Sequence, residues 1–158
     1  MKKVLKLNSQ HVDKCLDLIK SEDELFYFYR KIGWSDNQII LQLNKQTNYS
    51  FGFFEDNKLI AFIFGDLISI EKKSEYEILL LYVKSTKRYN GIGTDLISYI
   101  LEKKDNYKLS KIFLDVAENN SSAIKFYKKH NFILNYIRGG YYIINNIKIN
   151  ALCFSRKL

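Results

Sequence analysis

Two glycines separated by a single residue precede an apolar helical repeat in the stretch KRYNGIGTDLISYI, at residues 87–100. The chain has only seven glycines and no proline, so this pair is unusual within the sequence. Glycine lets the backbone approach a ligand closely, and the first turn of a helix presents unpaired N–H groups that bind anions. Arg88 adds a positive charge three residues before Gly91. The spacing therefore predicts either a loop that binds a diphosphate or a tight turn between a strand and a helix.

Two familiar phosphate-binding motifs do not fit this loop. The dinucleotide-binding fingerprint requires a third glycine three residues after the second, and Leu96 occupies that position. A P-loop requires Gly-Lys followed by serine or threonine, whereas this chain continues Gly-Thr-Asp. The remaining pattern, Arg88-x-x-Gly91-x-Gly93, does not by itself decide between a ligand loop and a turn.

The hydrophobic pattern predicts which elements must position this loop. In chain order we expect a strand at 3–7, a helix capped by Ser9, a helix capped by Ser35, two strands at 49–70 joined at Asp56-Asn57, a strand at 76–84, a helix after the glycines, a strand at 111–117, a helix capped by Asn120 or Ser121, and one or two closing strands. This order indicates an α+β fold, with a single mixed, mostly antiparallel sheet flanked by helices. We expect one domain, residues 1–158.

Composition and charge narrow the classes of protein. Apolar residues make up 47% of the chain and aromatic residues 15%, which favours a folded globule over disorder. The net charge of +8 is compatible with an anionic ligand, with nucleic acid or simply with solvated surface lysines, but no basic block is present. We therefore expect no direct role in binding nucleic acid.

The sequence shows no signal for a membrane, a metal or disulfide bonds. No uncharged apolar run approaches the roughly 20 residues of a membrane span, and the amino terminus lacks the apolar stretch of a signal peptide. Asp66 interrupts the most apolar run. The two cysteines, Cys15 and Cys153, are isolated from each other. We expect a reduced, cytoplasmic protein without a metal or a membrane partner, and the sequence does not indicate its oligomeric state.

The segment from Glu77 to Tyr142 resembles the Gcn5-related N-acetyltransferase (GNAT) superfamily, whose R/Q-x-x-G-x-G/A loop holds the pyrophosphate of acetyl-CoA. Within the superfamily the chain is most similar to the bacterial ribosomal-protein-alanine N-acetyltransferases. The stretches that carry this likeness are GWSDNQI, EILLLYV, FLDVAENNSSAIKFYKKHNF, IRGGYY and NALCFSRKL. One departure is Gly33, where these enzymes usually have proline. The resemblance implies the GNAT-like fold of acyl-CoA N-acyltransferases and acetyl-CoA as the co-substrate.

The resemblance also implies which residues contact the cofactor. Backbone groups of one strand would contact the pantetheine arm, the glycine loop would wrap the diphosphate, and an asparagine would contribute from the next helix. The cofactor residues implied in this way are Leu81, Tyr82, Val83, Arg88, Tyr89, Asn90, Gly91, Ile92, Gly93, Thr94 and Asn120. As plain sequence, Leu81 and Val83 are core positions and Asn120 is a helix cap.

Attack of an amine on a thioester requires a base for the amine and an acid for the departing thiolate. By resemblance, Tyr127 is the acid, although a tyrosine at this helical position otherwise only packs. Asp115 holds the position of the family's general-base glutamate, one methylene shorter. Glu77 on the neighbouring strand is the rival base, and Glu118 is a third candidate that we expect to face solvent.

The resemblance implies a protein or peptide amino terminus as the acceptor, with an alanine of a small-subunit ribosomal protein favoured. Arg138, Tyr141 and Tyr142 resemble the element that closes over this terminus, and Trp34 either lines the acceptor groove or anchors a helix. An acetyltransferase of a small amine and a non-catalytic acyl-CoA-binding module are the alternatives. A nucleic-acid-binding domain is disfavoured because the positive residues form no single stripe.

Overall fold

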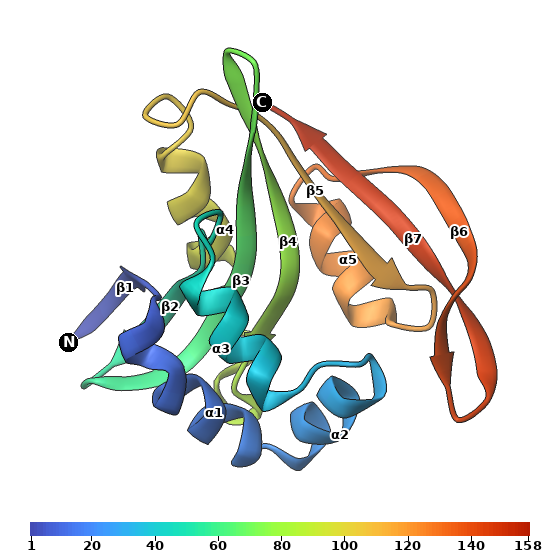
Figure 1. The fold of residues 1–158 in the computed structure, drawn as a ribbon, viewed down its shortest axis with the longest axis horizontal. Coiled ribbons are helices and arrows are strands. Elements are labelled where there is room, and N and C mark those ends of the chain that lie inside the picture. The colour runs from blue at the N-terminus through green and yellow to red at the C-terminus, as the bar shows by residue number, and fades with distance from the viewer.

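The computed structural model describes residues 1–158, apart from the side chains of Glu24, Leu25 and Phe28. Its elements are β1 (Lys2–Lys6), η1 (Ser9–His11), α1 (Val12–Lys20), α2 (Asp23–Lys31), α3 (Asp36–Asn44), β2 (Phe51–Glu55), β3 (Lys58–Ile70), β4 (Lys73–Val83), η2 (Ser85–Lys87), α4 (Ile92–Glu102), β5 (Leu109–Ala117), α5 (Ser121–Lys129), β6 (Ile133–Ile144) and β7 (Ile147–Lys157), shown in Figure 1.

All seven strands form one sheet in the order β1-β2-β3-β4-β5-β7-β6. Neighbouring strands are antiparallel except for β4 and β5, which are parallel and are joined through α4. A parallel pair needs such a crossover because its two strands run in the same direction. The predicted fold class, a mixed and mostly antiparallel sheet flanked by helices, is confirmed.

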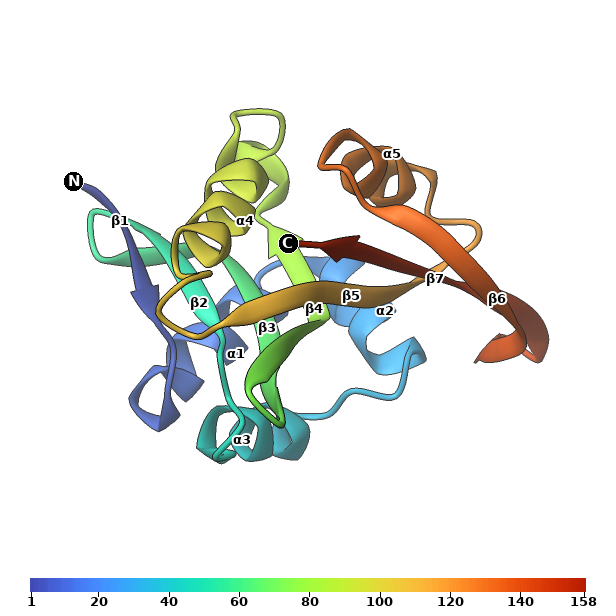
Figure 2. The same ribbon diagram turned by 90° about the horizontal axis from the view of Figure 1, so that it is seen from above.

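Helices cover both faces of the sheet, and each face has its own apolar cluster. Helices α4 and α5 lie on one face, and α1, α2 and α3 lie on the other (Figure 2). Under α4, Leu96, Ile97 and Ile100 are fully buried against the sheet. Under α1 and α3, Cys15 and Ile39 are equally buried. Because both faces are covered, the central strands lie in the interior of the molecule.

The local signals read from the sequence had mixed success. Ser35 and Asn120 cap α3 and α5 as predicted, with side-chain oxygens that accept from the backbone N–H group of the third residue of each helix. Asp56 and Asn57 both adopt positive φ, as a two-residue hairpin turn requires. The prediction that Ser9 caps the first helix is wrong, because Ser9 begins the 3-10 turn η1, which Asn8 caps, and α1 follows with His11 at its N-cap and no side-chain cap.

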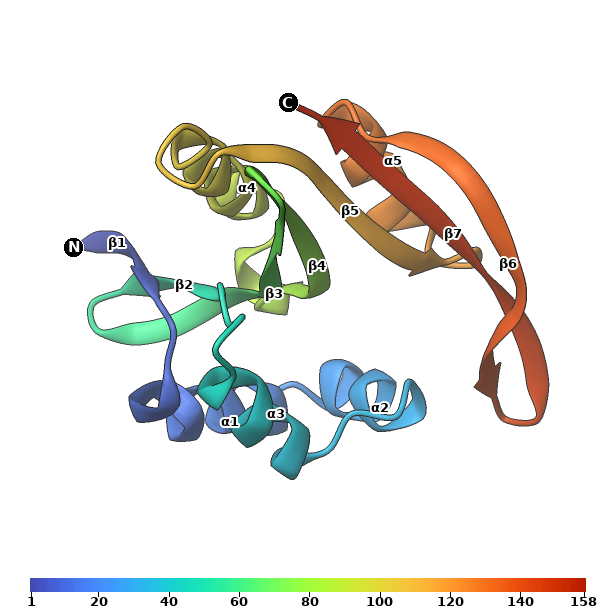
Figure 3. The same ribbon diagram turned by 45° about the horizontal axis from the view of Figure 1, so that its top comes forward.

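Strands β4 and β5 pair over only part of their lengths. Their register ends at Ile78 opposite Leu114, although β4 continues to Val83 and β5 to Ala117. At the same level the pairing of β3 with β4 shifts by one residue, so that Leu79 forms a bulge. Figure 3 shows the two strands separating beyond this point. We refer to this unpaired stretch, residues 79–83 of β4 and 115–117 of β5, as the strand opening.

Candidate active site

A pocket of about 510 Å³ lies beside the strand opening. It is formed by the end of α2 and the following turn, by the middle of β4, by β5 and by β6. The lining residues are Lys31, Ile32, Gly33, Trp34, Glu77, Ile78, Leu79, Asp115, Tyr141, Tyr142 and Ile143. The pocket thus brings together both leading candidate bases and three of the four residues predicted to bind the acceptor.

The turn between α2 and α3 forms one wall of the pocket. Gly33 adopts a φ of +88°, which a glycine tolerates without strain. The backbone N–H of Trp34 donates to the carbonyl of Tyr29. The side-chain hydroxyl of Tyr29 in turn donates to the carbonyl of Ser35. The Trp34 ring stacks on Phe64 at 5.8 Å between centroids. Trp34 therefore anchors the helices and lines the pocket at the same time.

A polar contact joins this wall to the opposite side of the pocket. The Lys31 ammonium, at the end of α2, donates to the side-chain carbonyl of Asn145 in the turn between β6 and β7. These residues are 114 positions apart in the chain. The sequence had not identified either of them as part of the site.

The two candidate bases have different surroundings. Glu77 pairs in register with Phe113, and Asp115 lies two residues further along β5, so both carboxylates are on the same face of the sheet. The Asp115 carboxylate forms an ion pair with the Arg138 guanidinium at 3.3 Å. Glu77 has no hydrogen bond or salt bridge to any side chain that the structure describes. Its carboxylate is therefore available to a ligand in the pocket.

Aromatic rings hold Arg138 in place. Its guanidinium lies 5.7 Å from the ring centre of Tyr136 and 5.3 Å from that of Tyr141, and it donates to the Tyr136 hydroxyl at 3.1 Å. Such cation–π contacts favour the charged group near the ring faces. The predicted residues Arg138 and Tyr141 thus contact each other, and Arg138 faces Asp115. No motif in the sequence had pointed to Tyr136.

The electrostatic environment raises the pKa of Glu77. Partial burial is the largest cause, and the negative charges of Asp66 and Asp115 act in the same direction. The positive charges of Lys45 and Arg138 oppose this rise without cancelling it. Glu77 therefore carries a carboxylate whose affinity for a proton exceeds that of an ordinary glutamate.

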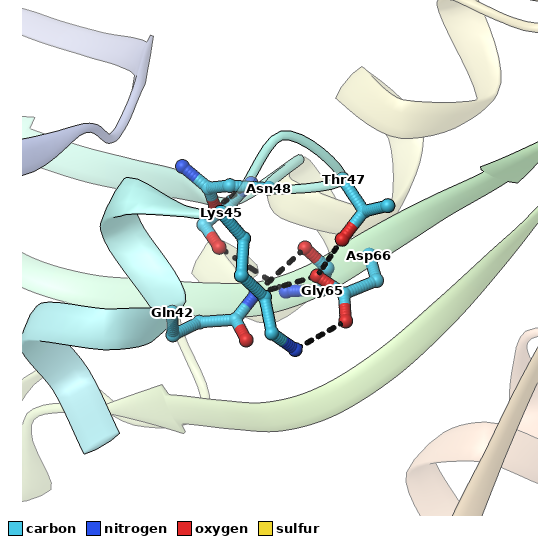
Figure 4. Close-up of polar contacts among 7 residues, drawn as sticks. Gln42, Lys45, Thr47, Asn48, Gly65 and Asp66 are labelled. Atoms are coloured by element: carbon cyan, nitrogen blue, oxygen red, sulfur yellow. Dashed lines mark hydrogen bonds and ion pairs between the residues drawn. The ribbon is translucent and has the colours of Figure 1, made fainter.

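Asp66 faces Glu77 directly across β3 and β4 and is itself firmly held. Its carboxylate accepts from the Gln42 amide at 2.8 Å, from the Thr47 hydroxyl at 3.2 Å and from the Lys45 ammonium at 2.9 Å (Figure 4). These contacts satisfy a carboxylate that is only 8% exposed. The charged residue that interrupts the most apolar run of the sequence thus lies behind the pocket.

Tyr127 packs on the opposite face of the sheet from the carboxylates. It is buried in the cluster under α4 and α5, where its ring contacts Phe126 and Phe132. Burial raises the pKa of its hydroxyl, and the nearby Tyr142 adds to this rise. The hydroxyl makes no hydrogen bond to the residues that the structure describes. It is therefore neutral and able to donate a proton.

The glycine loop lies outside the pocket lining, at the start of α4. Gly91 is the N-cap of α4 with a φ of +80°, and a side chain there would meet no other atom within 4 Å. Gly93 has a different role, because a Cβ atom would lie 3.1 Å from the ring of Phe126 on α5. One glycine thus provides an open helix start, and the other allows α4 and α5 to pack closely.

The remaining predicted residues surround this loop or lie near it in sequence. Arg88 stacks on the Tyr82 ring and donates from Nε to the Val83 carbonyl at 3.1 Å. Tyr89 is 96% exposed. Thr94 Oγ1 lies 3.1 Å from a ring nitrogen of His130. The other residues predicted to bind the cofactor lie in three places. Asn90 is in the loop and Ile92 in the first turn of α4, Leu81 is in the strand opening, and Asn120 is at the N-cap of α5.

Glu118, the third candidate base, has a structural role. Its two carboxylate oxygens accept from the backbone N–H and the side-chain amide of Asn150, both at 3.0 Å. It does not belong to the pocket lining. These contacts connect the end of β5 to β7.

The sequence profile of the acetyltransferase (GNAT) family matches residues 15–132, which span most of the elements described above. The chain belongs to the acetyltransferase (GNAT) family. Among the described residues no helix is both long and apolar enough to cross a membrane. Nor does the described part of the chain contain a group of three or more His, Cys, Asp or Glu side chains placed to hold a metal ion.

Individual relatives agree with this membership. The chain is 29% identical over 111 residues to an uncharacterized N-acetyltransferase of Methanocaldococcus jannaschii. The match covers 67% of this chain and 48% of that relative, so the chain spans about half the length of the relative. The ribosomal-protein-S18-alanine N-acetyltransferase of Escherichia coli has the same fold, with a TM-score of 0.82, 16% identity, and coverage of 99% and 94% of the two chains. Arabidopsis thaliana NAA60, in complex with a bisubstrate analogue, gives a TM-score of 0.81, 19% identity, and coverage of 99% and 98%.

The raised pKa of Glu77 predicts how the substitution Glu77→Gln affects stability. A carboxyl group whose pKa is higher in the folded state than in the unfolded state destabilises the fold once it ionises. Glutamine stays neutral and removes this penalty. We expect Glu77→Gln to unfold at a higher temperature than the wild type at pH 8, with a difference that shrinks as the pH falls below 4 and the glutamate becomes protonated in both states.

Thermal unfolding followed by circular dichroism across this pH range measures the effect. Asp115→Asn is the matched control, because it breaks the ion pair with Arg138 and should give no gain at pH 8. A Glu77→Gln variant that unfolds at a lower temperature than the wild type at pH 8 contradicts the electrostatic account.

Proposed function

We propose that the protein transfers an acetyl group from acetyl-CoA to the α-amine at the amino terminus of a protein, with an amino-terminal alanine of a small-subunit ribosomal protein as the preferred acceptor. The observation that carries this proposal is the strand opening. Carboxylates lie on one face of the sheet beside it, a neutral tyrosine hydroxyl lies on the other face, and a helix start with an open glycine follows β4.

The residues of the opening suit the parts of acetyl-CoA. Backbone groups of Leu81 to Val83 that face away from β3 lack a strand partner in β5, so they are able to bind the amides of a pantetheine arm. The start of α4 at Gly91 favours a diphosphate, and Arg88 adds a positive charge. Acetyl-CoA supplies the acetyl group as an activated thioester.

Glu77 is the base that we assign to the acceptor amine, ahead of Asp115. A general base works best when its pKa approaches the working pH, and the pKa of Glu77 is raised. The Asp115 carboxylate is already engaged in an ion pair with the Arg138 guanidinium, whereas Glu77 has no such partner among the described residues. We give Asp115 and Arg138 the task of positioning the acceptor. An α-amine suits this arrangement because its pKa of about 8 leaves a fraction already neutral near pH 7.

A comparison of two substitutions tests this assignment. We expect Glu77→Gln to lower kcat by about 10²–10⁴-fold, the usual contribution of a positioned acid or base. Asp115→Asn should mainly raise the KM for the acceptor. Steady-state release of free thiol from acetyl-CoA measures both constants. If Asp115→Asn lowers kcat more than Glu77→Gln does, the roles of the two carboxylates are reversed.

Tyr127 is the acid that we assign to the departing sulfur, because its hydroxyl is neutral and has no described hydrogen-bond partner. Tyr127→Phe removes only this hydroxyl and keeps the packing of the ring. We expect kcat to fall by about 10²–10⁴-fold with an unchanged unfolding temperature. Tyr99→Phe is the matched control, since Tyr99 packs against the same cluster from α4. Equal turnover in the two variants would leave Tyr127 as a packing residue only.

The acceptor is inferred from the pocket and supported by one structural relative. Tyr141 and Tyr142 are in ring contact at 5.0 Å and crowd the pocket opposite Trp34, which favours a small first side chain. The Escherichia coli structural relative is named for its action on an alanine of ribosomal protein S18. At 16% identity this likeness establishes the fold alone, so the choice of acceptor is part of our proposal.

Competition among amines tests the acceptor. Peptides that begin with alanine should react with a kcat/KM about tenfold or more above that of peptides that begin with leucine or phenylalanine, because a larger side chain would contact the tyrosine pair. A peptide with a blocked amino terminus and a free lysine should be a poor substrate. Faster reaction of this lysine peptide, or of spermidine, would reassign the enzyme to another acceptor. Binding of acetyl-CoA without transfer to any amine would identify a non-catalytic module.

A further inference from the structure

A buried carboxylate outside the pocket connects the amino-terminal helices to the end of β4. Glu22 lies between α1 and α2 and is only 9% exposed. One of its carboxylate oxygens, Oε2, accepts from the Tyr82 hydroxyl at 2.7 Å and from the Ser85 backbone N–H at 3.0 Å. The Glu22 backbone is held as well, since its carbonyl accepts from the Phe26 N–H at 2.9 Å. The carboxylate is thus a fixed point on the helical layer.

The two groups that Glu22 holds lie directly before the glycine loop. Tyr82 is near the end of β4, and its ring carries the stacked guanidinium of Arg88. Ser85 is the first residue of η2, the turn that leads from β4 into the loop. The loop itself has few contacts with the core, since Tyr89, Asn90 and Gly91 are all exposed. Its position therefore depends on the residues that fix its amino-terminal end.

Charge explains why a carboxylate serves this purpose. Burial disfavours the ionised form of Glu22, but hydrogen bonds from Tyr82 and Ser85 and the positive charge of Lys84 outweigh it and lower the pKa. Glu22 is therefore ionised at neutral pH. Charge-assisted hydrogen bonds are stronger than neutral ones, so an ionised acceptor fixes two donors firmly. Without it, the Tyr82 hydroxyl and the Ser85 N–H would lose their acceptor.

We propose that Glu22 is a positioning residue that fixes the glycine loop, residues 88–94, in the conformation that binds the diphosphate of acetyl-CoA. The identity of this ligand rests on the proposed function. Glu22 does not touch the reacting atoms, and its effect is transmitted through the Tyr82 hydroxyl and the Ser85 amide. A loop that is ordered before binding loses less conformational entropy when the ligand arrives, so the anchor increases affinity for the cofactor.

The affinity for CoA, measured by calorimetric titration without an acceptor, tests the proposal. We expect Glu22→Ala to raise the Kd for CoA by about tenfold or more, because the loop must then be ordered during binding. Amide hydrogen exchange of residues 85–94 should become faster in the same variant without CoA. Glu22→Gln keeps an acceptor oxygen and should give a smaller increase in Kd, and it serves as the second variant if Glu22→Ala does not fold.

The matched control is Asn48→Ala. Asn48 is equally buried and also joins separate elements, since its amide donates to the carbonyls of Leu7 and Leu43, but it contacts neither Tyr82 nor Ser85. This variant should lower the unfolding temperature and leave the Kd for CoA within about twofold of the wild type. If Glu22→Ala, or Glu22→Gln where only that variant folds, leaves both Kd and loop exchange unchanged, or if Asn48→Ala raises Kd as much, the proposal is overturned.

The outcome also separates this inference from the proposed function. If the acceptor is not the amino terminus of a protein, the titration is unaffected, because it contains CoA and no amine. A wild-type protein that does not bind CoA would overturn the proposed function, and the exchange rates of the loop amides would then decide alone whether Glu22 fixes the loop.

Discussion

The early end of the pairing between β4 and β5 is the constraint on which the rest of the site depends. A central parallel pair would normally continue to the ends of its strands, because each unpaired backbone group in the interior carries a cost. Here the register stops at Ile78 and Leu114, next to the bulge at Leu79. The sheet thus provides unpaired backbone groups in its middle, and elements on its two faces are able to act on a common ligand there.

The bulge also changes the direction of the side chains along β4. Tyr76 and Ile78 belong to the cluster under α4, whereas Leu80 and Tyr82 belong to the cluster under α1 and α3. One additional residue reverses the alternation, as expected when a strand has a side-chain period of two. This reversal brings the Tyr82 hydroxyl to Glu22, so the bulge connects the strand opening to the anchor of the glycine loop.

The sequence was most informative where structure is determined locally. The caps at Ser35 and Asn120 and the turn at Asp56-Asn57 depend on neighbours within a few residues, and all three are present in the structure. The helix α2 was missed because tyrosine and phenylalanine are more typical of strands than of helices, although the segment has an amphipathic helical pattern. The aromatic composition of this segment is thus the reason that the helix was not predicted from the sequence.

Features that depend on contacts between distant segments could not be predicted. The bulge at Leu79, the ion pair of Asp115 with Arg138 and the contact of Lys31 with Asn145 require the register of strands that are far apart in the chain. The roles of the candidate residues, predicted from the resemblance, remain predictions. One signal of the polar contacts behind the pocket is present in the sequence, because a charged residue within an apolar strand, such as Asp66, marks a position where burial must be compensated.

The charge distribution of the pocket differs from that of the whole molecule. The pocket is balanced in charge, because Glu77 and Asp115 are matched by Lys31 and by the Arg138 guanidinium, whereas the whole protein has a net charge of +8. A protonated amine is drawn to the Glu77 carboxylate, which has no ion pair among the described residues, whereas an anionic co-substrate is drawn to the molecule as a whole. Dissolved ions weaken both attractions over about a Debye length, roughly 8 Å at physiological ionic strength. The encounter with the anionic co-substrate should therefore become slower as salt is added, whereas the encounter with a protonated amine should depend less on salt, because salt also screens its repulsion by the net positive charge.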